Sequence, residues 1–195
     1  MTGMINRLAP DFVLPAIAGN RLALSDWRGF VVVLNFWSVQ CAWSRRADVV
    51  LVYRQLTWFP KGVRILGVCS NVNETETEMM YEAESRHVKY PLLLDIEHRV
   101  ADLYKAETTP HLFVLDRQGI VRYIGALDDA TFKQREAKTI YLDRAVNAVL
   151  DNRPPDPVTT PPYGCALVRQ LPRMGPLIYP LNVGERFRLW IKKIA

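Results

Sequence analysis

A single cysteine stands where an apolar segment ends and a helix-compatible segment begins. Residues 31–37 are rich in β-branched and aromatic side chains, and three residues separate them from Cys41. A thiol at the amino end of a helix faces unpaired backbone amides and the positive end of the helix dipole, and both favour the thiolate. Arg45 and Arg46 add positive charge one turn later. We therefore expect Cys41 to be a nucleophile that attacks a disulfide sulfur or a peroxide oxygen, giving a mixed disulfide or a sulfenic acid.

Ser44 stands three residues after Cys41, where a redox Cys-x-x-Cys pair would have its second thiol. A hydroxyl cannot form a disulfide, so a dithiol cycle would need a distant cysteine or an external thiol. Two roles are open for Ser44: its hydroxyl donates a hydrogen bond that lowers the pKa of Cys41, or it caps the helix. The alternative for Cys41 itself is a buried structural cysteine, because Cys often behaves as a small apolar residue in cores.

Further segments accompany this cysteine in a defined order. Residues 9–15 (APDFVLP) and 22–29 (LALSDWRG) precede it, residues 108–119 (TTPHLFVLDRQG) follow it, and 125–129 (GALDD) precede 161–165 (PPYGC). This order resembles the thioredoxin superfamily, and more narrowly its redoxin branch of alkyl hydroperoxide reductase and thiol-specific antioxidant proteins. The resemblance covers roughly residues 8–166, and the ordered set is more specific than any one motif.

The resemblance implies roles for residues around Cys41. Pro110 would be a cis-proline that faces the cysteine, and Thr109 would pair through its backbone with an extended substrate. Trp37 and Trp43 would form an apolar rim that excludes water, although Trp37 also suits a plain core position. Together these residues would make a substrate-binding groove beside the thiol.

Other residues bear on how the cycle is completed. Peroxiredoxin-like relatives also carry a Gly-Cys pair in the tail, so Cys165 is either a resolving cysteine or a packed tail cysteine. Cys69 follows a second apolar strand, at the edge where α/β sheets place ligands, but a core or rim position suits it better. Ser38 stands three residues before Cys41, where peroxiredoxins place a hydroxyl that orients the peroxide. Leu34 replaces the proline that usually precedes it, which weakens the case for a peroxidase.

The elements that would position these residues alternate between strands and helices. Apolar patterns predict strands at 31–37, 63–68, 91–94, 112–115 and 121–124, and helices at 44–58, 73–84, 97–104 and 134–150. In the first helix, the apolar residues have spacings compatible with a helix; they are Val49, Val50, Val52, Tyr53 and Leu56. The expected fold is α/β and thioredoxin-like, with a central mixed sheet flanked by helices and a Pro-rich extended C-terminal tail.

The chain changes character after Arg153. Eight of its 13 prolines lie in residues 154–195, and proline excludes a regular helix there. We expect residues 1–153 to form a thioredoxin-like redoxin domain and residues 154–195 to form an extension packed on it. The side chains expected to hold this extension are Tyr163, Leu167, Leu177, Ile178 and Tyr179. Residues 186–193 alternate basic and apolar side chains, which predicts an edge strand, with a membrane-surface segment as the alternative.

The composition is that of an ordinary globular protein, with 49% hydrophobic and 23% charged residues. The net charge of +5 is dispersed, so nucleic acid is not an expected partner. Neither a secretory signal nor an apolar run of membrane-spanning length is found, and three cysteines are an odd number, so reactive thiols in the cytoplasm are expected. The histidines lack metal-ligand spacing and no phosphate loop is present, so neither a metal nor another cofactor is expected.

The sequence therefore predicts a thiol-dependent oxidoreductase, an antioxidant redoxin with Cys41 as its single active cysteine. Its partners would be protein or low-molecular-weight thiols and disulfides. One alternative is a peroxiredoxin-like thiol peroxidase, in which Cys41 is peroxidatic, Cys165 resolves it and peroxide is the substrate. The other alternative is a thioredoxin-fold binding module, in which Cys41 is vestigial and the groove at Pro110 holds a partner peptide.

Overall fold

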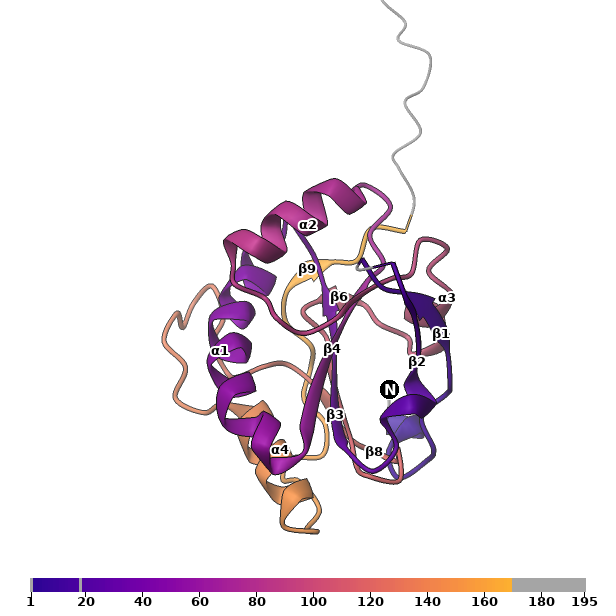
Figure 1. Cartoon of the computed structure of the whole chain (residues 1–195). Helices are drawn as coiled ribbons and strands as arrows, with labels where there is room; N and C mark the ends of the chain where they lie inside the picture. Colours follow the sequence, from indigo (N-terminus) through magenta and orange to yellow (C-terminus); the bar gives the residue numbers. More distant parts are fainter. Residues whose placement is uncertain (1, 18, 170–195) are drawn as a thin grey trace, which may run out of the picture.

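A five-stranded mixed sheet forms the centre of the computed structural model, which describes residues 2–17 and 19–169 (Figure 1). The strand order is β5-β4-β3-β7-β8, with β3 at Val31–Trp37, β4 at Val63–Cys69, β5 at Leu92–Leu94, β7 at Leu112–Leu115 and β8 at Val121–Gly125. Strand β3 runs parallel to β4 and antiparallel to β7. Two short pairs complete the strands, β1 (Val13–Pro15) with β2 (Arg21–Ala23) and β6 (Thr108–Thr109) with β9 (Cys165–Ala166).

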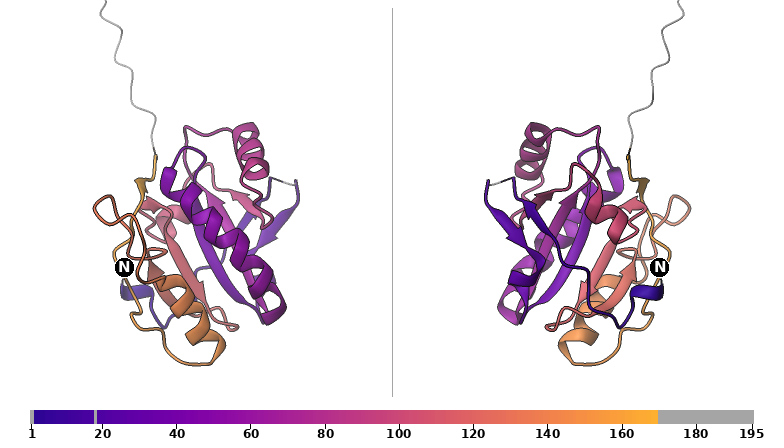
Figure 2. Two further views of the ribbon diagram at one scale, coloured as in Figure 1. Left: turned by 90° about the vertical axis from the view of Figure 1, so that its left-hand side faces the viewer. Right: turned by 90° about the vertical axis from the view of Figure 1, so that its right-hand side faces the viewer.

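Helices cover both faces of the sheet. They are α1 (Ala42–Trp58), α2 (Glu76–Ser85), α3 (Arg99–Leu103) and α4 (Tyr141–Leu150), with short 3-10 turns at Thr2–Met4, Leu24–Trp27 and Phe59–Lys61. Helices α1 and α4 lie against one face, and α3 lies with the β1–β2 pair on the other (Figures 1 and 2). Within residues 2–17 and 19–169, no helix has the length and apolar character needed to cross a membrane.

Strand β3 faces a separate apolar core on each side. Val31, Val33 and Trp37 join the core beneath α1 and α4, whereas the even-numbered residues of the strand join the core beneath α3. All seven residues of β3 are buried, as expected for a central strand that is covered on both faces. The strand is therefore a firmly packed base for the residues that follow Trp37.

The helix predicted here is confirmed, but its apolar residues divide between core and solvent: Val50 and Val52 pack against the core, whereas three others face solvent. Val49, Tyr53 and Leu56 are 74%, 61% and 73% exposed. The buried residues of the helix are instead Ser44, Ala47, Asp48, Leu51 and Trp58. Asp48 tolerates this position because the indole nitrogen of Trp37 donates a hydrogen bond to its carboxylate at 2.9 Å.

The last helix is shorter than the sequence predicted. It begins at Tyr141 rather than at Gln134, and the preceding residues form an irregular loop. The carboxylate of Asp129 accepts hydrogen bonds from the backbone N–H groups of Lys138 (2.8 Å) and Thr139 (3.1 Å), which holds that loop in a non-helical course. The helix packs on the sheet through its buried residues, which are Leu142, Ala145, Val146, Ala148 and Val149.

The segment after α4 returns beside β8 and leads to β9 (Figure 2). The hydroxyl oxygen of Thr160 accepts the backbone N–H of Ala126 at 2.9 Å, and Leu167 is buried. Of the other side chains expected to hold the extension, Leu177, Ile178 and Tyr179 lie outside the described residues, as does the strand predicted at 186–193. The domain boundary at residue 153 stays a prediction.

Candidate active site

Cys41 is the N-cap residue of α1, which begins at Ala42 rather than at the predicted Ser44. The Cys41 backbone is extended, and its sulfur accepts the backbone N–H of Ser44 at 3.4 Å. The sulfur thus takes the place that a side-chain oxygen fills at most helix starts. The local sequence produces this position, because the buried strand β3 ends at Trp37 and a three-residue loop turns the chain into the helix.

Two buried charged side chains hold the loop of residues 38–40. Glu74 accepts the backbone N–H groups of Val39 at 3.0 Å and Gln40 at 3.2 Å. Arg86 donates to the carbonyl oxygen of Ser38 at 3.1 Å and also to that of Val39. The backbone polar groups on both sides of the loop are therefore paired within the protein, which fixes the approach to Cys41.

A chain of hydrogen bonds runs from Cys41 to the C-terminal segment. The Cys41 N–H donates to the hydroxyl of Ser38 at 3.2 Å, and that hydroxyl donates to Glu74 at 2.5 Å. Asn71 donates to the same carboxylate at 2.9 Å, and its side-chain oxygen accepts the backbone N–H of Val168 at 2.8 Å. The network ties the segment just after β9 to the loop just before α1.

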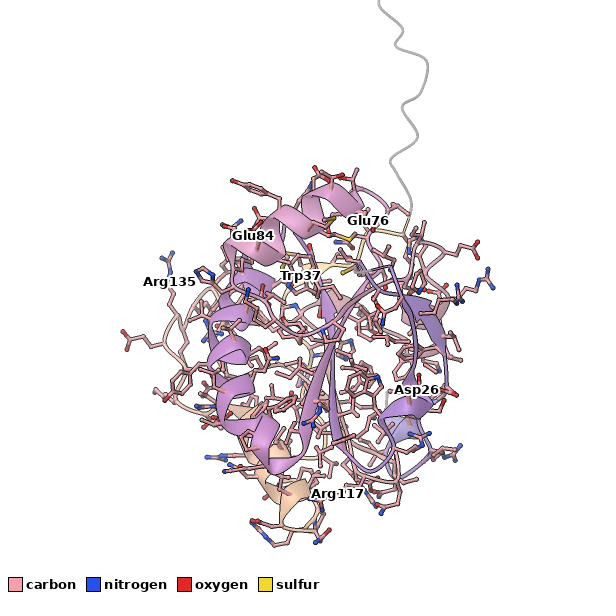
Figure 3. All side chains as sticks on the ribbon, in the orientation of Figure 1. Asp26, Trp37, Glu76, Glu84, Arg117 and Arg135 are labelled. Atoms are coloured by element: carbon pink, nitrogen blue, oxygen red, sulfur yellow. The ribbon has the colours of Figure 1, made fainter. Side chains whose placement is uncertain are left out.

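Trp37 does not form the predicted rim. It is fully buried beneath α1 and α2 (Figure 3), and its indole nitrogen is bonded to Asp48. Arg86 pairs with the same carboxylate at 3.1 Å, and the hydroxyl of Tyr90 donates to it at 2.7 Å. Burial raises the pKa of Asp48, although these partners oppose the shift. The sequence offered a core position as the alternative for Trp37, and the structure places it there.

Cys165 lies directly against Cys41. The two sulfurs are 2.7 Å apart and both thiols are free. A disulfide has a sulfur–sulfur distance of about 2.05 Å, so a small movement of the side chains would close the bond. Gly164 permits this approach, because a Cβ atom there would lie 2.2 Å from the carbonyl oxygen of Thr109. The structure therefore brings together the two cysteines that the sequence offered as nucleophile and resolving thiol.

Replacing Gly164 with alanine is expected to separate the two sulfurs without removing either thiol. The added methyl group would push β9 away from Thr109, so the equilibrium constant for forming a Cys41–Cys165 disulfide should fall about tenfold or more. Titration against glutathione redox buffers measures this constant. Gly3→Ala is a matched control, since a Cβ atom at Gly3 meets nothing within 4 Å. An unchanged constant in Gly164→Ala would show that the close approach is not needed.

The peptide bond between Thr109 and Pro110 is cis, as the sequence predicted. The carbonyl oxygen of Thr109 lies 2.7 Å from the sulfur of Cys41. The edge of Thr109 was expected to pair with an extended substrate, but it pairs with Cys165 of the chain itself in the antiparallel β6–β9 ladder. The C-terminal segment occupies this edge in the structure, and pairing of Thr109 with a substrate stays a prediction.

The two thiols differ in acidity. Burial raises the pKa of Cys41, but the contact with Cys165 and the hydrogen bond from the Ser44 amide lower it, and the pKa lies below its ordinary value. The Thr109 carbonyl, which accepts from the thiol, acts in the opposite direction. Burial and the neighbouring Cys41 raise the pKa of Cys165 to about 11. Cys41 is therefore the more acidic thiol of the pair.

Comparison with known proteins agrees with this geometry. Residues 5–124 match the model of the AhpC/TSA family. The chain belongs to the AhpC/TSA family. Thiol-disulfide oxidoreductase ResA of Geobacillus kaustophilus is 32% identical over 120 residues, which cover 62% of this chain and 68% of that protein. The predicted membership of the thioredoxin superfamily and the predicted thiol-dependent oxidoreductase class are confirmed, since the homologues are thiol–disulfide oxidoreductases of the ResA type.

Solved structures support the thioredoxin-like fold of this AhpC/TSA-family chain. An uncharacterized conserved protein from Geobacillus kaustophilus superposes with a TM-score of 0.79 at 27% identity, covering 86% of this chain and 93% of that one. A hypothetical protein from Sinorhizobium meliloti 1021 gives a TM-score of 0.77 at 26% identity, covering 86% and 96%. The predicted α/β fold with a mixed central sheet is confirmed.

Ser44 takes neither role that the sequence proposed for it. Its hydroxyl is buried and has no hydrogen-bond partner within the part of the chain that the structure describes. The helix cap is the sulfur of Cys41, and only the backbone N–H of Ser44 reaches it. Cys69 is also buried, and burial raises its pKa well above the ordinary value, with Glu74 adding to the effect. Cys69 is therefore a poor nucleophile, in agreement with the predicted core position.

Trp43 lies beside the two thiols as part of an aromatic group. Its ring meets Tyr163 edge-on at 4.8 Å and Phe132 at 5.4 Å between centroids. Next to this group is a cavity of about 250 Å³, lined by Ala42, Trp43, Arg46, Thr131, Phe132 and Arg135. These contacts are compatible with the apolar rim expected of Trp43, and that role stays a prediction. Phe132 is 76% exposed and was missed by the sequence analysis, which placed no functional residue in that loop.

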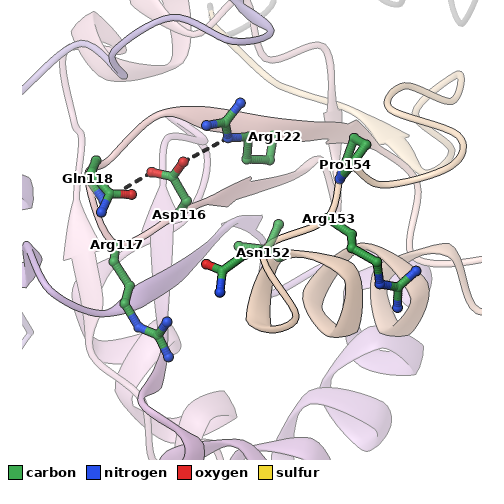
Figure 4. Close-up of a pocket in the computed structure, with 8 residues that line it drawn as sticks. Asp116, Arg117, Gln118, Arg122, Asn152, Arg153 and Pro154 are labelled. Atoms are coloured by element: carbon green, nitrogen blue, oxygen red, sulfur yellow. Dashed lines mark hydrogen bonds and ion pairs between the residues drawn. The ribbon is translucent and has the colours of Figure 1, made fainter.

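A second cavity of about 270 Å³ lies at the opposite end of β7 from Pro110 (Figure 4). Its lining residues are Asp116, Arg117, Gln118, Arg122, Val149, Asn152, Arg153 and Pro154. Asp116 is paired with Arg122 at 2.7 Å, and the side chains of Arg117 and Arg153 point away from that pair. In residues 2–17 and 19–169, no group of three or more His, Cys, Asp or Glu side chains is placed to hold a metal ion.

Acid is expected to destabilise the fold through His111, which follows the cis-proline. His111 is fully buried, and burial lowers its pKa to about 4, against about 6.5 in an unfolded chain. The unfolded state binds the proton more readily between these values, so stability falls as the pH drops through this window, by about 3 kcal/mol in all. Denaturant unfolding at pH 7 and pH 4.5 measures the loss. His111→Asn should abolish the loss of unfolding free energy between pH 7 and pH 4.5, whereas the exposed control His87→Asn should retain it. Equal losses in the two variants would contradict the attribution to His111.

Proposed function

We propose that this chain is a thiol–disulfide oxidoreductase whose redox centre is the Cys41–Cys165 pair, which replaces a Cys-x-x-Cys motif. In one direction, a partner disulfide gains two electrons and two protons and becomes two thiols. The same electrons and protons leave Cys41 and Cys165, which join in a disulfide. In the other direction, a partner dithiol reduces that disulfide. The observation that carries this proposal is the 2.7 Å contact between the two sulfurs.

The contact favours the pair over a cycle that uses Cys41 alone. A thiol held against the active sulfur reacts at an effective concentration far above that of any thiol in solution. Cys41 would form a mixed disulfide with an external thiol only if Cys165 stayed inert beside it. The lowered pKa of Cys41 also argues against the binding module with a vestigial cysteine, because a depressed pKa makes a thiol reactive near neutral pH.

The contacts do not favour the peroxidase alternative. The hydroxyl of Ser38, which would orient a peroxide, donates its hydrogen to Glu74, and Cys41 is only 2% exposed. We therefore expect hydrogen peroxide to oxidise Cys41 no faster than it oxidises a free cysteine thiolate. Stopped-flow oxidation of the reduced protein measures the rate. A rate at least 100-fold above that of free cysteine thiolate would restore the peroxidase.

Disulfide mapping by mass spectrometry tests the proposed centre. The reduced protein is oxidised with glutathione disulfide, blocked with N-ethylmaleimide and digested. A peptide pair linked through Cys41 and Cys165 is the expected product, in the wild type and in the control Cys69→Ser. Glutathione adducts on Cys41 without that link would refute the pair and support the single-cysteine cycle.

The proposal extends to partners and location. Exchange with protein partners follows from the homology to ResA-type oxidoreductases, and low-molecular-weight thiols and disulfides are proposed as further partners. A cytoplasmic location is proposed from the sequence alone. Cell fractionation with an antibody against the chain tests it, and recovery with the envelope would contradict it.

A further inference from the structure

The geometry of disulfide exchange distinguishes the two sulfurs of the proposed centre, so this inference rests on that proposed function. An attacking thiolate approaches one sulfur from the side opposite the sulfur that leaves. An attack on Cys41 would have to come through its other neighbours. The Thr109 carbonyl lies 2.7 Å from the Cys41 sulfur, the Ser44 amide lies 3.4 Å from it, and the residue is 2% exposed. An external thiol has no path to this sulfur while β9 is in place.

Cys165, unlike Cys41, is open to an external thiol. Both residues of β9 are exposed, and Cys165 contacts Cys41 on one side. The antiparallel pairing of Thr109 with Cys165 in the β6–β9 ladder holds this residue in position. An attack on Cys165 would release Cys41, and the thiol with the lower pKa is the better leaving group. The exposure of Cys165 and the lower pKa of Cys41 as leaving group both favour attack on Cys165.

We propose that Cys165 is the sulfur that exchanges with external thiols, and that Cys41 is the internal sulfur of the pair. A thiolate of an external dithiol attacks the sulfur of Cys165. The Cys41–Cys165 bond breaks, and its electron pair leaves with Cys41 as a thiolate. The second thiol of the partner then attacks the partner sulfur of the mixed disulfide and releases Cys165, while the two partner protons pass to the two released sulfurs. The partner dithiol is oxidised to a disulfide and the centre is reduced.

This assignment differs from the sequence prediction in the cysteine that reacts with the external partner: the sequence predicted Cys41, and the structure favours Cys165. In the direction that reduces a partner disulfide, the same steps run in reverse. Cys165 forms the mixed disulfide, and Cys41 then attacks the sulfur of Cys165 and expels the partner thiolate. Cys41 acts only on the sulfur that it already touches, which explains how a buried thiol takes part in exchange.

The site of attack can be mapped with glutathione. The protein is first oxidised to the Cys41–Cys165 disulfide, mixed with glutathione for milliseconds to seconds, and quenched with acid. Thiols that have been released are then labelled with N-ethylmaleimide and the peptides are analysed by mass spectrometry. We expect glutathione on Cys165 and the label on Cys41 in at least tenfold excess over the reverse pattern, extrapolated to zero time. Equal amounts, or an excess of glutathione on Cys41, would overturn the proposal.

The same experiment separates this proposal from the function on which it rests. Failure to form any Cys41–Cys165 disulfide in the first step would refute the redox centre. A disulfide that forms normally but takes glutathione on Cys41 would leave the centre intact and refute only the assignment of Cys165. The variant Cys69→Ser removes the third cysteine and should give the wild-type pattern. A pattern that changes in this variant would mean that Cys69 exchanges with the pair, which also contradicts the proposal.

Discussion

Replacing Cys165 with serine is expected to reduce the rate of disulfide turnover about 100-fold or more. The change removes only the sulfur that contacts Cys41 at 2.7 Å, and an external thiol at millimolar concentration cannot match a thiol held in contact. Cys41, which is only 2% exposed, would then be left without the sulfur through which it exchanges. The rate is measured as the reduction of a fluorescent glutathione disulfide, with dithiothreitol as the reductant.

Two controls show whether the effect is specific to the Cys165 sulfur. Cys69→Ser removes a buried thiol with a raised pKa and should turn over at the wild-type rate. The reduced Cys165→Ser protein should unfold within about 1 kcal/mol of the reduced wild type, because Cys165 is exposed. A Cys165→Ser variant that turns over at the wild-type rate would mean that Cys41 works alone.

Replacing Glu74 with glutamine is expected to lower the equilibrium constant for forming the Cys41–Cys165 disulfide from glutathione disulfide about tenfold. In glutamine, an NH2 group replaces one of the two carboxylate oxygens that accept hydrogen bonds from the loop at residues 38–40. A donor of that loop would then lose its acceptor, and a buried donor without an acceptor lowers stability by about 1–3 kcal/mol. Both ends of the centre would loosen, because Glu74 bonds Ser38 before Cys41 and Asn71 holds Val168 after Cys165. Titration in glutathione redox buffers gives the equilibrium constant.

The exposed residue Glu76 supplies the matched control for this experiment. Glu76→Gln makes the same chemical change in the first turn of α2, at a side chain that lies on the surface (Figure 3), and it should leave the constant unchanged. A role of Glu74 in stability alone would lower the free energy of unfolding in Glu74→Gln without moving the thiol equilibrium. That outcome would contradict the positioning role.

Much of the centre could be predicted from local patterns. The apolar run of β3 followed by Cys41 placed this cysteine at the start of a helix, and the segment around Pro110 indicated the cis bond. The Gly164–Cys165 pair was recognised as a possible resolving unit. These features are readable because each is encoded by neighbouring residues: a buried strand, a helix start, a proline and a glycine.

The remaining parts depend on contacts between distant residues, which no local pattern reveals. Glu74 and Arg86 look like ordinary helix-surface charges in the sequence, yet they are buried against the loop before Cys41. The apolar residues of α1 do not reveal its buried face, because Val49 and Leu56 face solvent whereas Asp48 has hydrogen-bond partners inside the protein. Buried polar groups are favourable only where their partners meet in space.

Cys41 and Cys165 are separated by 124 positions in the chain. Joining them would close a ring that contains most of the domain, and such a ring removes much of the freedom of the unfolded polypeptide. The chain-entropy relation gives about 5 kcal/mol for a ring of this size. Oxidation would therefore also stabilise the folded domain, and the melting temperature of the protein would report whether the ring is open or closed.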